Sequence, residues 1–153
     1  MKKVGILGSG IVGQTLAKGF LKHGYEVMIS SRNPSKLEEF VKENENKILS
    51  GTFQDAIKFA DLLILAVKGT AAKDLIKDLG NLENKTIVDT TNPIEESAPE
   101  NGVLRFFSGI NRSLMEELQE HAPKANFVKA FNSIGSAFMV NPDFEFRPTM
   151  FIA

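Results

Sequence analysis

The 153 residues suffice for one domain with a hydrophobic core, and the composition, 42% apolar and 24% charged, is typical of globular proteins. A net charge of −1 gives no basic excess for nucleic acid or an anionic membrane surface, and no apolar run reaches the ~20 residues that span a bilayer. The absence of cysteine excludes disulfides, thiolate metal sites and cysteine nucleophiles, and it favours a cytoplasmic location.

Apolar runs and helical spacings alternate along the chain. In chain order we expect a strand over 4–7, a helix over 11–22, a strand over 25–30, a helix over about 34–44, an edge strand over 47–51, a helix over 53–59, a strand over 61–67, a helix around 75–79, a strand over 86–89, a loop over 95–107, a helix over 113–121, and strands over 127–131 and 149–153. The first helix is expected to carry Ile11, Leu16, Phe20 and Leu21 on one face. This alternation predicts a Rossmann-type, three-layer α/β/α fold with a doubly wound, mainly parallel sheet, formed by residues 1–153 as a single domain.

The chain stops within the expected apolar strand 149–153. A doubly wound domain normally adds a helix over the face of such a strand. We therefore expect a truncated form that lacks its C-terminal helices; the alternative is that a partner covers the strand.

A glycine-rich sequence joins the first strand to the first helix. It reads Gly8-Ser9-Gly10-Ile11-Val12-Gly13. Glycines at these spacings allow a sharp turn, a close approach of the backbone to a pyrophosphate, and tight packing of the helix on the sheet. The free N–H groups and the dipole of the helix would favour the anion. The alternative is a turn whose glycines serve packing alone.

The second strand ends at two hydroxyls and a guanidinium, in the sequence Ser30-Ser31-Arg32. Ser31 and Arg32 stand where an acidic residue would bind the ribose 2′-hydroxyl of NAD. Arginine instead suits a 2′-phosphate, with further help from Ser9 and from Lys36 in the next helix. We therefore predict an NADP-binding domain, and the alternative is a solvated loop.

Three further strand ends are expected at the same edge of the sheet, where ligands of open α/β folds bind. Their candidate ligand-binding residues are Ala66, Val67, Asn92, Pro93, Asn132, Ser133 and Ile134. For Asn92-Pro93 the alternative is a plain turn, and for Asn132-Ser133 it is a helix cap.

Acid–base groups are scarce near these strand ends. Asp89 and Lys68 are the nearby ionisable residues, and neither is assigned as a general acid or base. His23 and His121 fall at helix ends away from the cleft, and no metal-ligand spacing exists. With no catalytic residue assigned, the pattern favours hydride transfer to a flavin-type acceptor, because the cofactor itself carries that chemistry.

Together these motifs resemble the deazaflavin-dependent NADP oxidoreductase family. The most specific part is the run from Val128 to Gly135, a strand that leads into Phe-Asn-Ser-Ile-Gly. The amino-terminal domain of the mammalian six-transmembrane metalloreductases is similar. The resemblance implies hydride transfer between NADP(H) and a deazaflavin (coenzyme F420) or a flavin (FMN or FAD), and a homodimer. It also implies that Asn92, Pro93, Asn132, Ser133 and Ile134 lie near the nicotinamide or the second ring.

Two other functions remain open. Ala66-Val67-Lys68 is also similar to pyrroline-5-carboxylate reductases, so an imine or carbonyl reductase is one alternative. A non-catalytic NADP(H)-binding module is another. The expected partner is a small-molecule redox acceptor, and neither nucleic acid nor a membrane.

Overall fold

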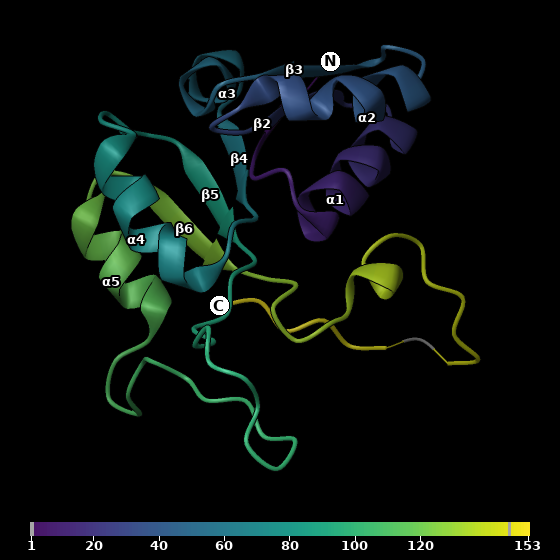
Figure 1. The fold of residues 1–153 in the computed structure, drawn as a ribbon. Helices are drawn as coiled ribbons and strands as arrows, with labels where there is room; N and C mark the ends of the chain where they lie inside the picture. Colours follow the sequence, from purple (N-terminus) through teal and green to yellow (C-terminus); the bar gives the residue numbers. More distant parts are fainter. Residues whose placement is uncertain (1, 147) are drawn as a thin grey trace.

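The computed structural model describes residues 2–146 and 148–153, and its centre is a six-stranded sheet in which neighbouring strands are parallel (Figure 1). In spatial order the strands are β3 (Ile48–Gly51), β2 (Glu26–Ser30), β1 (Lys3–Leu7), β4 (Leu62–Leu65), β5 (Thr86–Asp89) and β6 (Asn126–Lys129). Because the strand order reverses between β1 and β4, this is the predicted doubly wound Rossmann arrangement.

Helices cover both faces of the sheet (Figure 1). One face carries α1 (Ile11–Lys22), the 3-10 helix η1 (Pro34–Leu37) and α2 (Glu38–Glu43). The other carries α3 (Phe53–Phe59), α4 (Gly69–Asp78) and α5 (Leu114–His121). A second 3-10 helix, η2 (Ser136–Phe138), lies against α1. The three-layer α/β/α prediction is thereby confirmed.

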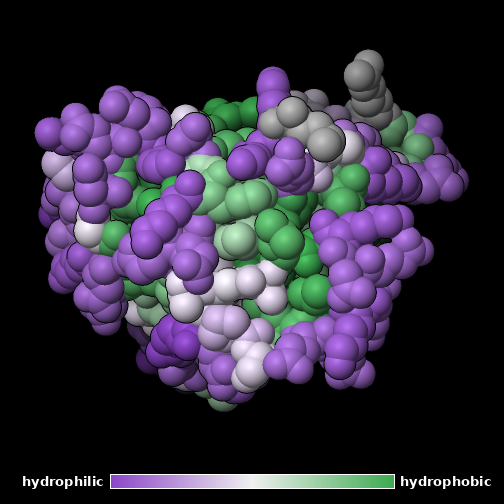
Figure 2. Space-filling model, turned by 90° about the horizontal axis from the view of Figure 1, so that it is seen from above, coloured by the Kyte–Doolittle hydropathy of each residue, from purple (hydrophilic) through white to green (hydrophobic). Residues whose placement is uncertain are grey.

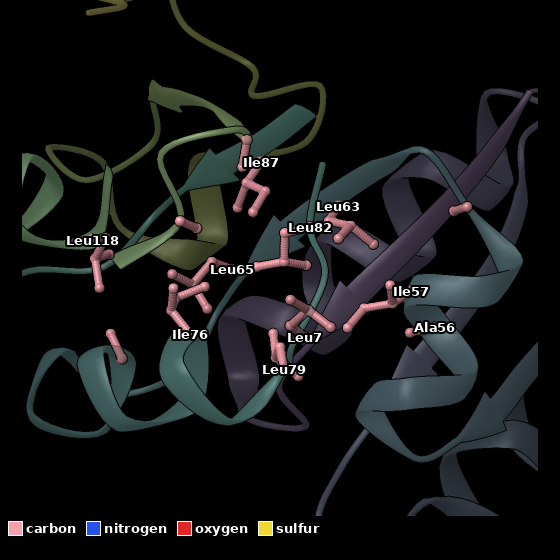
Figure 3. Close-up of a cluster of buried hydrophobic side chains, with 14 of the residues drawn as sticks. Leu7, Ala56, Ile57, Leu63, Leu65, Ile76, Leu79, Leu82, Ile87 and Leu118 are labelled. Carbon is pink, nitrogen blue, oxygen red and sulfur yellow. The ribbon is translucent and has the colours of Figure 1, made fainter. Parts of the chain in front are cut away.

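Side chains that alternate along each strand divide the core between the two faces. In β4, Leu63 and Leu65 pack towards α3, α4 and α5, whereas Ile64 packs towards α1. Figure 3 shows the first of these clusters, in which Leu7 of β1 lies near Ile57 of α3 and near Leu79, the residue that follows α4. Each such fully buried side chain contributes about 2 kcal/mol.

The helix expected over 34–44 begins as the 3-10 turn η1 and becomes α-helical only at Glu38. The expected strands 61–67 and 127–131 are shorter, because β4 ends at Leu65 and β6 at Lys129. After β6, Phe131 has a φ of 63°, which turns the chain away from the sheet. The edge strand predicted at 47–51 is confirmed as β3.

Ile11, expected on one helical face with Leu16, Phe20 and Leu21, is 68% exposed and does not join Leu16 in the core. It occupies the first position of α1, directly after the N-cap residue Gly10. Leu16, in contrast, is buried against β1 and β2, as predicted.

The strand expected at 149–153 does not form. Only Ala153 pairs with β6, through two backbone hydrogen bonds with Lys129, at 2.7 Å and 3.1 Å. An antiparallel strand would bring residues 150–152 opposite 130–132, but the turn at Phe131 removes the extended partner.

The loop expected between β5 and α5 is confirmed, although its arms pair with each other. Ile94 bridges Phe106, and Phe107 donates its backbone N–H to the Pro93 carbonyl at 2.9 Å. We call residues 93–107 the paired loop. It extends beyond the carboxyl end of β5 (Figure 1).

The surface seen from above carries polar side chains around apolar residues that remain visible between them (Figure 2). Within residues 2–146 and 148–153, no helix is long and apolar enough to cross a membrane.

Candidate functional site

The glycine loop between β1 and α1 is held by close backbone contacts. Gly8 has a φ of 134°, and a Cβ there would overlap the carbonyl oxygen of Ala66. A Cβ at Gly13 would in turn overlap the carbonyl oxygen of Gly8. Gly10 differs, because a Cβ at this position would have no neighbour within 4 Å. The loop backbone is therefore tightly packed at Gly8 and Gly13 and uncovered at Gly10.

The start of α1 is open to the same side. Gly10 is the N-cap residue, no side chain caps the helix, and the first turn contains no acidic residue. The first backbone bond of the helix runs from the Gln14 N–H to the Gly10 carbonyl, at 2.9 Å. N–H groups at such a helix start suit an anion.

Ser31 and Arg32 lie beside the loop, at the end of β2. The Ser31 hydroxyl is 3.4 Å from the Ser9 hydroxyl and accepts the Asn33 N–H at 3.2 Å. Arg32 is exposed and forms no ion pair with any residue in the described ranges. Lys36 is also exposed, one turn further on. This corner presents positive charge and hydroxyl groups together.

Two cavities meet above the carboxyl ends of β1 and β4. The Arg32 cavity, of about 630 Å³, extends towards β2 and β3, and the Thr91 cavity, of about 430 Å³, extends towards β5. Both are lined by Gly10, Ala66, Val67 and Lys68. They therefore form one groove across the point where the strand order reverses.

Most of the predicted site residues line this groove, namely Gly8, Ser9, Gly10, Ile11, Val12, Ser31, Arg32, Ala66, Val67 and Asn92. The lining does not include Gly13, Lys36, Pro93, Asn132, Ser133 or Ile134. Gly13 lies beneath the loop. Asn132 adjoins the groove, because its carbonyl accepts the Asn92 side-chain N–H at 2.8 Å.

The sequence does not indicate four residues of the Thr91 cavity, which are Thr70, Ile94, Glu95 and Glu96. Gly69, Thr90 and Thr91 also line it, and they belong to the strand ends that the sequence places at this edge of the sheet. Gly69 had a detectable signal, as a glycine that follows a buried strand; a Cβ there would overlap the Asn92 carbonyl. Thr91 is 3% exposed, and its Oγ1 is the buried side-chain oxygen that has no hydrogen-bond partner within the described chain. Only the folded arrangement reveals this orphaned hydroxyl.

Two pairs of ionisable side chains lie at or next to the site. Asp89 is fully buried, and its Oδ2 lies 2.8 Å from Lys129 Nζ, so this pair has a structural role. Lys68 Nζ donates to Glu96 at 3.1 Å, and this hydrogen bond, with the lysine charge, lowers the pKa of Glu96. Among the described residues no cluster of acidic or histidine side chains has the arrangement of a metal site.

A model of the family described as "NADP oxidoreductase coenzyme F420-dependent" matches residues 3–93. This range includes the glycine loop, the Ser31-Arg32 corner and Asn92. Among solved structures, a candidate F420-dependent NADP reductase from Arthrobacter sp. FB24 superposes with a TM-score of 0.83 at 28% identity, covering 93% of this chain and 67% of that one.

Two curated proteins are also similar. The NADPH-dependent reductive aminase of Aspergillus oryzae is 32% identical over 93 residues, which are 60% of this chain and 31% of the aminase. The metalloreductase STEAP3 of Rattus norvegicus is 30% identical over 135 residues, which are 88% of this chain and 25% of the metalloreductase. The chain thus spans about a third or less of each.

Proposed function

The chain belongs to the family of coenzyme F420-dependent NADP oxidoreductases, and on this premise we propose that it transfers a hydride between NADP(H) and a deazaflavin or flavin acceptor. The observation that carries the proposal is the continuous groove, formed by the Arg32 and Thr91 cavities, across the carboxyl ends of β1 and β4. Dinucleotides bind doubly wound sheets at this reversal point.

The proposed pyrophosphate site is the open start of α1. The bare Cα of Gly10 leaves room for the phosphates, and the N–H groups of Ile11, Val12 and Gly13 would donate hydrogen bonds to them. The contacts of Gly8 and Gly13 support this proposal, because they fix the loop in the shape that leaves the helix start uncovered.

The proposed 2′-phosphate site is the corner of Ser9, Ser31 and Arg32, with Lys36 adding charge. A guanidinium binds a phosphate through two parallel hydrogen bonds, and Arg32 has no acidic partner within the described chain. Positions 30–33, at the end of β2, read Ser-Ser-Arg-Asn and so carry no acidic residue that would select NAD. These features support NADP over NAD.

The proposed nicotinamide site is the Thr91 cavity, lined by Val12, Ala66, Val67 and Asn92. We propose that Pro93, Asn132, Ser133 and Ile134 border the two rings from the adjoining strand ends. When bound, NADPH supplies the hydride. The side chains of this site would hold the reacting rings and exclude water, and none is assigned as an acid or base.

A second candidate is an imine or carbonyl reductase, favoured by the identity to the reductive aminase. For either function we propose a small-molecule acceptor as partner. A homodimer and a cytoplasmic location remain predictions.

Stopped-flow measurement of NADPH oxidation tests the proposal. We expect oxidation that requires added deazaflavin or FMN. Oxidation with cyclic imines alone would support the second candidate instead. Tight NADPH binding without turnover on any acceptor would indicate a non-catalytic binding module and contradict the proposed activity.

A further inference from the structure

Asp89 and Lys129, at the carboxyl ends of β5 and β6, hold one residue of the groove between them. The Thr91 N–H donates to Asp89 Oδ1 at 2.9 Å, and Lys129 Nζ donates to the Thr91 carbonyl. Lys129 Nζ also donates to Asp89 Oδ2, at 2.8 Å. The ion pair thus binds both backbone groups of Thr91, which is a wall residue of the Thr91 cavity.

Thr91 lies beyond the last backbone bonds of the sheet. β5 ends at Asp89, whose carbonyl accepts the Ala130 N–H at 3.2 Å. Within the described ranges, no backbone group forms a hydrogen bond with the N–H or the carbonyl of Thr91. Thr91 is 3% exposed, so these two groups need partners inside the protein, and the side chains of Asp89 and Lys129 supply them.

An apolar pair would join β5 to β6 without this contact. The register of the two strands places Asp89 beside Lys129, and their side chains are 0% and 18% exposed. Two apolar side chains would pack at these positions without the cost of removing charges from water, so a buried ion pair is weak evidence for stability alone. What the charged pair adds is a fixed donor and a fixed acceptor for the Thr91 backbone.

The next wall residue, Asn92, is fixed in the same way. Its carbonyl lies against the start of α4, where a Cβ on Gly69 would be 2.0 Å from the oxygen. Its side-chain N–H donates to the Asn132 carbonyl at 2.8 Å. Because Thr91 and Asn92 share a peptide bond, a shift of the Thr91 carbonyl would also displace Asn92.

We propose that Asp89 and Lys129 are positioning residues for the nicotinamide of NADP(H). By fixing the backbone of Thr91, they hold the cavity wall in the shape that accepts the ring. Neither side chain belongs to the lining of the Thr91 cavity, so both act through Thr91. This positioning role rests on the proposed function, which assigns the nicotinamide to that cavity.

Two probes separate the halves of the cofactor. The emission of NADPH rises and shifts to the blue when its reduced nicotinamide leaves water, so it reports the surroundings of the ring. Adenosine 2′,5′-bisphosphate carries the adenosine and its 2′-phosphate but no nicotinamide, so calorimetry with this probe reports the other half of the groove.

The variants to compare are Lys129→Met, Lys129→Met combined with Asp89→Asn, and the surface control Lys124→Met. We expect saturating NADPH to emit as in the unaltered protein in the control, and nearly as in water in both variants without Lys129. The affinity for the bisphosphate should be unchanged in all of them, which also shows that they are folded. The double variant should regain stability, because no charge stays buried, but it leaves the Thr91 carbonyl without its donor.

Three outcomes would overturn the inference: NADPH emission that recovers together with the Tm in the double variant, bound NADPH that emits as in water in the unaltered protein, or loss of bisphosphate binding in the double variant.

Turnover in the same samples tests the proposed function separately. A ring displaced by about 1 Å should lower kcat with FMN about 100-fold. Equal kcat in the unaltered protein and the double variant would support the function and remove the inference. The expected change in NADPH emission, without oxidation by the unaltered protein, would keep the inference and remove the function.

Discussion

Replacing Lys129 with methionine should destabilise the fold substantially. The substitution leaves the fully buried Asp89 carboxylate with the Thr91 N–H, at 2.9 Å, as its remaining donor. At 2.8 Å the direct attraction between the two charges is about 6 kcal/mol for an effective dielectric of about 20, and desolvation offsets part of it. Breaking a buried pair costs about 3–5 kcal/mol, and the retained N–H bond favours the lower figure.

A loss of about 3 kcal/mol corresponds to a fall in Tm of about 6–12 °C for a chain of this size. Thermal and urea unfolding would measure it. Lys124→Met is the matched control, because Lys124 is exposed and pairs with Glu83 at 3.3 Å on the surface, where such pairs contribute less than about 1 kcal/mol. Adding Asp89→Asn to Lys129→Met should restore much of the stability. Equal losses in the two lysine variants would refute the reasoning.

Three further predictions concern the groove and one helix start. Gly8→Ala should destabilise the fold, because its Cβ would overlap the Ala66 carbonyl. Gly10→Ala should keep the Tm but weaken NADPH binding, which calorimetry would measure. Unchanged NADPH binding in Gly10→Ala would contradict the proposed phosphate site. Thr91→Val should keep or raise the Tm while weakening ligand binding, because it removes a hydroxyl that only a ligand would satisfy; a lower Tm would indicate an internal partner. The backbone N–H of Ser113 lowers the pKa of Glu116, so the stabilisation by Glu116 is present above its unfolded pKa and is lost as the pH falls through its folded pKa. Glu116→Gln should therefore flatten the fall in stability on acidification, and an unchanged slope of urea midpoint against pH would contradict this.

Local sequence signals were sufficient to predict the sheet and the edge of the sheet that carries most of the candidate binding site. Continuous apolar runs such as 62–65 occur in parallel strands covered on both faces, and the glycine spacing at 8–13 fixes the first turn. Both features depend on neighbours in the chain, so the doubly wound parallel sheet and most of the groove could be predicted.

Features that depend on distant contacts could not be predicted. Ile11 has a helical spacing typical of a core residue, but it occupies the first position of α1 and is exposed. Residues 149–153 read as a strand, yet the positive φ of Phe131 removes their pairing partner. Gly19 in the interior of α1 is explained only by Val140, which packs where a Cβ would lie.

The prediction of the binding site from the sequence was incomplete for the same reason. Glu95 and Glu96 belong to a loop without helical or strand periodicity, and only the pairing of its arms brings them to the groove. The Asp89–Lys129 pair joins residues 40 positions apart that the register of β5 and β6 places side by side.

Calorimetric titration of NADPH and NADH into the unaltered protein and Arg32→Ala most directly tests the cationic corner beside the glycine loop. We expect the unaltered protein to prefer NADPH, and Arg32→Ala to weaken NADPH by about 1–3 kcal/mol while NADH binding hardly changes. Equal affinities for the two cofactors, or equal losses in the variant, would contradict the assignment of this corner to the 2′-phosphate.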